Sequence, residues 1–375
     1  MENLEKIITP NKKFWKNKRV LITGHTGFKG SWLTCWLLSY GAIVYGYSLK
    51  QLDKRGIFNK LKLKKKIKKN FFKDINNFYE LKKTITSIKP NVIFHMAAQS
   101  LVIDSYKNPL NTVNTNTLGT AKVLEASKYA KSLKSIIILT TDKVYENFEK
   151  KNYSYKENDK LGGGDIYSAS KSSAELIISA YRQSFRKAYK NCGIASVRAG
   201  NVIGGGDWAK NRLIPDIING FKKKRPKIIL RNPNFTRPWQ HVLEPLSGYM
   251  VLALALSKNI DLHGESFNFG PNTVHNYCVL DLVKEMSIYW DQVKWNDISS
   301  EISGPYESAL LKLNCDKALV YLKWISAMNF AQTVKMTSEW YRDYYQNTGN
   351  IKDVTLKQIQ EYTSIAKSNN ITWAI

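Results

Sequence analysis

The sequence feature that most constrains this fold is a turn with three glycines, placed between an apolar run and a periodic apolar segment. The apolar run at 20–22 leads into Gly24, Gly27 and Gly30, and the periodic segment follows at 31–40. Glycine lets the backbone turn tightly and approach a ligand closely. The N–H groups of the next helical turn can then face an anion such as a diphosphate. The pattern predicts a strand, a phosphate-binding turn and a helix.

The glycine spacing leaves an alternative open. In the common dinucleotide fingerprint the first two glycines are two residues apart, whereas Gly24 and Gly27 are three apart. A tight strand-to-helix turn without a ligand therefore remains a second interpretation. A Tyr–Lys pair at Tyr167 and Lys171 supports the cofactor, because residues four apart share one face of a helix. Tyrosine has a pKa of about 10, and a neighbouring ammonium lowers it towards that of a usable base.

Length and composition favour an ordinary enzyme. At 375 residues, with 43% apolar residues, the chain predicts one large or two fused domains. No apolar stretch is long enough for a membrane span, and residues 1–10 lack a signal peptide's hydrophobic region. The four cysteines are far apart and form no CxxC pair. We therefore expect a cytoplasmic protein without disulfides, zinc or another metal site.

The net charge of +27 raises a different class of function, binding to nucleic acid or to an anionic membrane. Lysines, however, are scattered along the whole chain, and the densest run is at 60–70. A solvated lysine-rich face explains this distribution more simply than a polyanion site. We expect no nucleic-acid partner and no membrane partner.

Strand and helix patterns alternate along the first half of the chain. The predicted strands lie at 20–22, 43–48, 71–75, 91–99 and 135–140, and the predicted helices lie at 31–40, 111–129 and from Tyr167 onward. This alternation predicts an α/β fold with a doubly wound parallel sheet, in which ligands bind beyond the carboxyl ends of the strands. A further amphipathic helix is predicted at 333–345.

The choice between NAD and NADP is poorly marked. An acidic residue near the end of the second strand usually holds the ribose of NAD. Asp53 is late for that role, and Lys50 could favour the phosphate of NADP. Later in the chain, a glycine-rich loop at 201–208 and an arginine- and aromatic-containing loop at 231–241 could hold a diphosphate and a sugar or base. Alone, these loops could equally be polar surface loops.

Six motifs in this order resemble the extended short-chain dehydrogenase/reductase family, and within it the nucleotide-sugar 4,6-dehydratases of the CDP-glucose branch. They lie at 24–32, 95–99, 142–147, 167–171, 198–208 and 236–242, and the resemblance runs from about Phe14 to Tyr345. It implies a Rossmann domain at 1–200 with about 236–268. It also implies a smaller C-terminal nucleotide-sugar domain at 201–235 and 269–345, followed by a tail at 346–375.

The resemblance implies a role for each motif. Residues expected to bind NAD, with NADP as an alternative, are Gly24, Thr26, Gly27, Phe28, Gly30, Asp74, Ile75, Ala97, Ala98, Gln99, Tyr167 and Lys171. Residues expected to bind the nucleotide sugar are Asn201, Arg231, Arg237 and His241.

The expected catalytic residues follow the fifth predicted strand and begin the Tyr167 helix. Tyr167 is expected as the base, with Lys171 lowering its pKa, while Thr141 binds the sugar 4-hydroxyl and Asp142 is the acid for water loss. Many dehydratases have a glutamate base next to that aspartate, where this chain has Lys143. A charged lysine is no base, so Lys143 needs a lowered pKa or another role.

The implied reaction oxidises C4, eliminates water across C5–C6 and returns hydride to C6. A 4-epimerase of the same fold is the nearest alternative, but it needs no acid such as Asp142. A non-enzymatic dinucleotide sensor or nucleic-acid-binding protein is a more distant one, and it would not need Thr141, Asp142, Tyr167 and Lys171 together. The family resemblance also implies a homodimer formed by the helices at 111–129 and from Tyr167.

Overall fold

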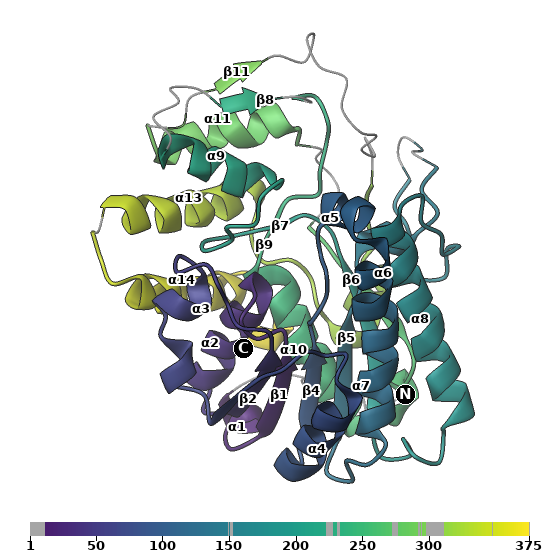
Figure 1. Ribbon diagram of the computed structural model, residues 1–375. Coiled ribbons are helices and arrows are strands. Elements are labelled where there is room, and N and C mark those ends of the chain that lie inside the picture. Colours follow the sequence, from purple (N-terminus) through teal and green to yellow (C-terminus); the bar gives the residue numbers. More distant parts are fainter. Residues whose placement is uncertain are drawn as a thin grey trace.

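The computed structural model describes residues 12–148, 150, 153–222, 228–230, 233–271, 277–291, 293, 295–297, 311–346 and 348–374. A seven-stranded sheet lies at its centre, in the order β10-β6-β5-β4-β1-β2-β3, and each neighbouring pair is parallel (Figure 1). The strands are β1 (Arg19–Thr23), β2 (Ile43–Ser48), β3 (Lys69–Phe72), β4 (Val92–His95), β5 (Ser135–Leu139), β6 (Gly193–Ala199) and β10 (Ser266–Phe269).

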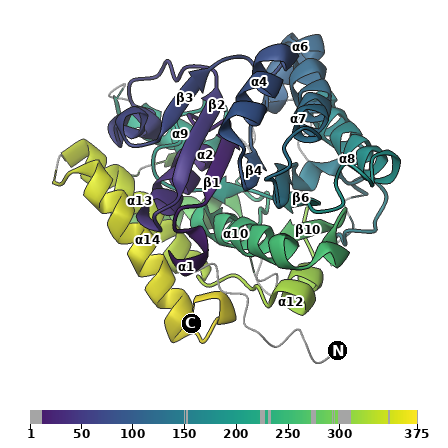
Figure 2. The same ribbon diagram turned by 90° about the horizontal axis from the view of Figure 1, so that it is seen from below.

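Helices cover both faces of the sheet, as Figure 2 shows from below. One face packs on α4 (Phe78–Ile88), α7 (Gly119–Ser127) and α8 (Ile166–Ser184). The other packs on α2 (Phe28–Ser39) and α10 (Leu243–Lys258), with α12 (Asp316–Leu322), α13 (Phe330–Gln346) and α14 (Ile351–Ser368) outside them. Because both faces are covered, β4 and β5 are buried at every position, as in other parallel sheets.

A second group of elements lies beyond the carboxyl ends of the strands (Figure 1). It contains α9 (Leu213–Lys222), α11 (Val279–Tyr289) and the parallel pair β8 (Ile228–Leu230) and β11 (Trp295–Asp297). The short parallel pair β7 (Val202–Ile203) and β9 (Gln240–His241) lies at the junction with the sheet. The remaining elements are α1 (Lys12–Trp15), α3 (Ile57–Lys60), α5 (Val102–Lys107), α6 (Pro109–Val113), a π-helical turn η2 (Asn114–Leu118), and the 3-10 turns η1 (Leu63–Lys65), η3 (Asp142–Val144), η4 (Ile260–Leu262) and η5 (Thr372–Ala374).

The predicted α/β fold with a doubly wound parallel sheet is confirmed. The helix expected at 31–40 begins earlier, at Phe28, so the third glycine of the motif lies inside α2. The helix expected at 111–129 is interrupted by η2. The C-terminal residues, for which the sequence predicted only a tail, form α14, where Tyr362 and Ile359 are buried. Within the described ranges, no helix has the length and apolar character needed to cross a membrane.

Candidate active site

A cavity of about 1790 Å³ lies beyond the carboxyl ends of the parallel strands. Its wall includes residues that follow β1, β2, β3, β4, β5 and β6, and residues of α9 close the other side. Ligand sites of single small molecules occupy roughly 300–1,000 Å³, so this cavity has room for two ligands. Its position is the one that a doubly wound sheet offers for a dinucleotide.

The glycine turn forms the wall of the cavity next to β1. Gly24 has a φ of +75°, and a Cβ there would lie 2.7 Å from the Ala97 nitrogen. A Cβ at Gly30 would collide with the Gly24 carbonyl, so neither position accepts a side chain. Gly27 is the N-cap of α2 and offers no side chain to the first helical turn. The backbone at this turn is therefore open to an anionic ligand from the cavity.

The far end of this wall comes from the residues after β2 and β3. Thr26, Ser48, Asp74 and Ile75 all line the cavity. The Thr26 hydroxyl lies 2.8 Å from that of Ser48 and donates to the Leu49 carbonyl at 3.0 Å. No acidic residue ends β2, since its last residue is Ser48. Asp53 lines the cavity but makes a 2.7 Å ion pair with Arg55. Lys50 is exposed and is not part of the wall.

Ala97 and Ala98 line the cavity after β4, but Gln99 does not. The Gln99 amide donates to the Leu101 carbonyl at 3.0 Å and to the Thr112 hydroxyl at 2.9 Å. Its backbone N–H donates to Asn116. The structure thus gives Gln99 a bracing role in the loop after β4, where the sequence predicted a cofactor contact.

The four residues expected at the nucleotide sugar have different positions. Asn201 and Arg237 line the cavity, and the Arg237 guanidinium lies 5.6 Å from the ring centre of Phe235. His241 is fully buried on β9, behind Gly204 and against the Trp32 ring, so it does not reach the cavity. Arg231 lies outside the described residues.

The expected catalytic residues meet at the ends of β5 and α8, and all five line the cavity. Thr141 and Asp142 follow β5, and the Thr141 hydroxyl donates to the Asp142 carboxylate at 2.9 Å. Tyr167 lies in the first turn of α8, where the N-cap Asp165 accepts from the Ser168 N–H at 3.0 Å. Thr141 also hydrogen-bonds the Tyr167 hydroxyl.

Burial dominates the electrostatics of this group. It raises the pKa of Asp142 above its ordinary value, against the opposing effects of Lys143, Thr141 and Lys29. It also raises the pKa of Tyr167 to about 12, and the Thr141 hydrogen bond only partly offsets this. The expected lowering of the Tyr167 pKa by Lys171 stays a prediction. The pKa of Lys171 itself is lowered to about 8, by burial first and by the nearby charge of Lys29 second.

Of the cationic residues of the cavity that were not predicted from the sequence, two are partly buried. Lys29 lies inside the glycine motif, and burial lowers its pKa to about 8 despite the opposing charges of Asp142 and Asp207. Arg212 immediately precedes α9 and donates to the Asp207 carboxylate at 2.8 Å and to the Ser100 hydroxyl at 3.1 Å. A signal for Arg212 was present, because an arginine closely follows the glycine-rich loop at 201–208.

Comparison with known proteins agrees with this geometry. Residues 21–337 match the sequence profile of the family described as GDP-mannose 4,6 dehydratase. This chain belongs to that family. The CDP-glucose 4,6-dehydratase of Salmonella typhimurium is 42% identical over 359 residues, which cover 94% of this chain and 98% of the relative.

Two solved structures show the same fold as this member of the GDP-mannose 4,6 dehydratase family. An epimerase from Methanothermobacter thermautotrophicus has a TM-score of 0.75 at 21% identity, over 91% of this chain and 96% of that one. The dTDP-glucose 4,6-dehydratase of Bacillus anthracis, in complex with NAD, has a TM-score of 0.72 at 22% identity, over 88% and 98% of the two chains. At these identities the likeness concerns the fold alone.

Proposed function

We propose that this protein is a dehydratase that converts CDP-glucose to CDP-4-keto-6-deoxyglucose. The observation that carries the proposal is the buried carboxyl group of Asp142 beside Thr141 and Tyr167, with a raised pKa. A 4-epimerase needs a base at the 4-hydroxyl but no acid for water loss. A non-enzymatic dinucleotide sensor needs neither group. The 42% identity to the Salmonella typhimurium enzyme supports CDP-glucose as the substrate.

The proposed cofactor is NAD. The glycine turn fits its diphosphate, because side chains are excluded at Gly24 and Gly30 and the backbone is left open. Asp74 and Ile75 would border the adenine, while Lys171 would hold the nicotinamide ribose. The position of Lys50 outside the cavity gives no support to a 2′-phosphate and thus to NADP. When bound, the nicotinamide ring would accept hydride from C4 of the sugar and later return it to C6.

The remaining chemistry belongs to side chains of this protein. Thr141 would orient the 4-hydroxyl, and Tyr167 would take its proton while C4 is oxidised. The 4-ketone then acidifies the hydrogen at C5. Asp142, whose raised pKa favours its protonated form, would give a proton to the 6-hydroxyl as water leaves. Lys143 lines the cavity beside Asp142, and its role in removing the C5 proton stays a prediction.

Binding of the nucleotide diphosphate is assigned to Asn201, Arg237 and Arg212. All three line the cavity, and a guanidinium can bind a phosphate through two parallel hydrogen bonds. The predicted domain boundaries, with the Rossmann domain at 1–200 and 236–268 and the nucleotide-sugar domain at 201–235 and 269–345, remain part of this proposal.

The decisive experiment is incubation of the purified protein and NAD with CDP-glucose, dTDP-glucose and GDP-mannose in parallel. A 4-keto-6-deoxy product is followed by its base-induced absorbance. We expect CDP-glucose to be converted fastest. Faster conversion of another nucleotide sugar would contradict the proposed substrate, and inversion at C4 without dehydration would contradict the reaction.

We also propose a cytoplasmic homodimer. All four cysteines are free thiols, as a reducing compartment favours. Large apolar side chains are exposed on α6, η2 and α8, which pack against one another: Leu110 is 84%, Leu118 49% and Leu176 62% exposed. A second copy could cover this face. Leu176→Glu should shift the molecular mass in size-exclusion light scattering from dimer to monomer, whereas Leu52→Glu, at an 89% exposed position elsewhere, should not.

A further inference from the structure

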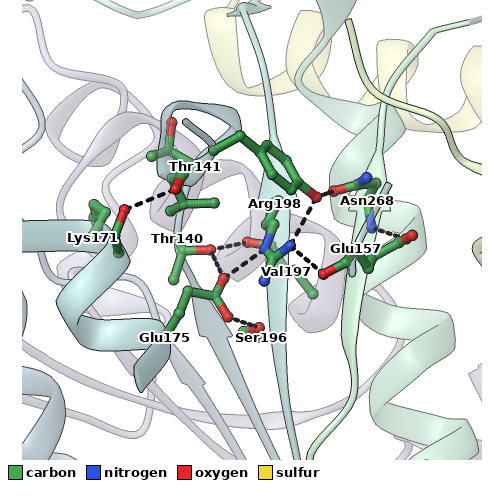
Figure 3. A network of polar contacts seen from close by, with 12 residues as sticks. Thr140, Thr141, Glu157, Lys171, Glu175, Ser196, Val197, Arg198 and Asn268 are labelled. Atoms are coloured by element: carbon green, nitrogen blue, oxygen red, sulfur yellow. Dashed lines mark hydrogen bonds and ion pairs between the residues drawn. The ribbon is translucent and has the colours of Figure 1, made fainter. Parts of the chain in front are cut away.

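A buried polar network surrounds the carboxylate of Glu175 on α8 (Figure 3). Glu175 is 7% exposed, and three side chains donate to it. The hydroxyls of Thr140 and Ser196 lie 2.6 Å from its two oxygens, and the Arg198 Nε lies 2.9 Å from one of them. These donors come from the end of β5 and from β6. Glu175 thus ties one helix to two neighbouring strands.

Arg198 is itself held from the other side. It donates to the Tyr145 hydroxyl at 2.8 Å and to the Glu157 carbonyl at 3.0 Å. The Tyr145 hydroxyl donates to Asn268 on β10 at 2.7 Å. A buried ion pair is weak evidence for stability, because desolvation of the two charges opposes their attraction. A network this complete, next to the proposed active site, therefore calls for a role other than stability alone.

The arrangement along α8 indicates that role. Tyr167, Lys171 and Glu175 are spaced by four residues, so they form one stripe on the helix. Each meets the end of β5 at a different point. Tyr167 is hydrogen-bonded by Thr141, Lys171 donates to the Leu139 carbonyl at 2.9 Å, and Glu175 accepts from Thr140. The segment that carries Thr141 and Asp142 is thus fastened to the helix that carries Tyr167.

We propose that Glu175 is a positioning residue for the dehydratase reaction, holding Thr140 so that the adjacent Thr141 and Asp142 stay aligned with Tyr167. This inference rests on the proposed function. The reaction rate depends steeply on the alignment of the reacting groups, since a displacement of about 1 Å can lower it roughly 100-fold. A further consequence follows from its charge. The charge of Glu175 raises the pKa of Lys171, whereas the charge of Lys29 lowers it. Lys171 in turn lowers the pKa of the buried His95.

Two hydroxyl deletions make a matched test. Thr140→Val and Ser196→Ala each remove a donor at 2.6 Å from Glu175, but only Thr140 adjoins Thr141. We expect Thr140→Val to lower kcat by roughly 10- to 100-fold with a smaller change in KM. Ser196→Ala should stay within about threefold of the wild type. Both variants should lower the melting temperature by a similar amount, because each leaves one oxygen of Glu175 with a donor fewer.

Thr140 also lines the cavity, so its effect must be shown to pass through Glu175. In the double variant Thr140→Val with Glu175→Gln, the loss of kcat should not exceed that of the more damaged single variant. If the losses of kcat in the two single variants multiply in the double variant, Thr140 affects kcat independently of Glu175. If Glu175→Gln fails to fold because Arg198 is left unpaired, the two hydroxyl variants still decide the proposal.

The pH profile separates positioning from a purely structural role. Without the charge of Glu175, the pKa of Lys171 should fall below its present value of about 8. The alkaline limb of kcat should therefore move to lower pH in Glu175→Gln, but not in Glu175→Asp, which keeps the charge. Quenching of tryptophan fluorescence by NAD gives a readout independent of turnover, and Ser196→Ala should bind NAD like the wild type.

Two failures can be told apart. A wild-type protein that forms no 4-keto-6-deoxy product would overturn the proposed function. A wild-type protein that forms it, while Thr140→Val and Ser196→Ala lose equal activity, would overturn only the role of Glu175. An alkaline limb of kcat at the same pH in Glu175→Gln and in the wild type would also overturn only the role of Glu175.

Discussion

The ammonium of Lys171 donates a 2.9 Å hydrogen bond to the carbonyl oxygen of Leu139, the last residue of β5. This contact holds the lysine on the strand and not on Tyr167, four residues earlier on the same helix. Burial raises the pKa of Tyr167 to about 12. Lys171 therefore joins α8 to β5 in this structure.

We expect Tyr167→Phe to lower kcat by roughly 10²–10⁴-fold, because the variant loses the group that takes the 4-hydroxyl proton. The side chain is only 8% exposed, and phenylalanine keeps its apolar ring. The melting temperature should change little. Tyr79→Phe, at a 72% exposed position on α4, is the control and should leave both quantities unchanged. Near wild-type turnover of Tyr167→Phe would remove Tyr167 from the mechanism.

Asp142→Asn should separate the two halves of the reaction. The amide cannot give a proton to the leaving water, so dehydration should slow by roughly 10²–10⁴-fold. Oxidation at C4 needs no acid, and reduced cofactor should accumulate in a single turnover, visible at its absorbance band. If the variant dehydrates normally, Asp142 is not the acid. If both steps slow equally, its role is structural.

Arg212→Lys should weaken substrate binding more than turnover. Arg212 bridges Asp207 and the hydroxyl of Ser100 across the cavity, and lysine cannot make both contacts. Loss of a charged hydrogen bond of this kind predicts a KM for CDP-glucose raised by roughly 10- to 100-fold. Arg342→Lys on α13, where the arginine lies near Glu339 and Asp343, is the control and should leave KM unchanged. An unchanged KM in Arg212→Lys would contradict the assignment.

Glu244 makes the stability of the fold depend on pH. Its buried carboxyl group accepts from the Met328 N–H at 2.7 Å and from the Tyr362 hydroxyl at 2.9 Å, and burial raises its pKa from 4.5 to about 7. At pH values between 4.5 and about 7, Glu244 is protonated in the folded state but has lost its proton in the unfolded state. The contribution of Glu244 to stability therefore falls as the pH rises through that window.

Glu244→Gln removes this titration. The difference in free energy of unfolding, variant minus wild type, should rise between pH 5 and pH 8 by at most about 3 kcal/mol. Urea unfolding at both pH values measures it, with Glu361→Gln on α14, next to Tyr362, as the control. A difference that stays constant, or falls, with pH would show that Glu244 is ionised in the folded protein throughout this range.

The sequence alone determined the order of the elements and the local motifs. The strand at Ile43–Ser48 and the helix that carries Tyr167 follow directly from apolar runs and their periods. The glycine turn could be recognised in the sequence because a side chain at Gly24 or Gly30 would collide with neighbouring backbone atoms, so that only glycine fits there. Helix starts were less accurate, since Gly27 caps α2 without the side-chain signal that marks most caps.

Only the tertiary structure decided what surrounds each motif. Glu175, Thr140 and Arg198 are far apart in the sequence and meet because parallel strands bring their carboxyl ends to one edge of the sheet. Whether a histidine such as His241 faces a ligand or the core depends on the packing of Trp32 and Gly204 against it, which no local pattern records. The pKa of Tyr167 likewise depends on burial, which has the largest effect on it and is a property of the whole fold.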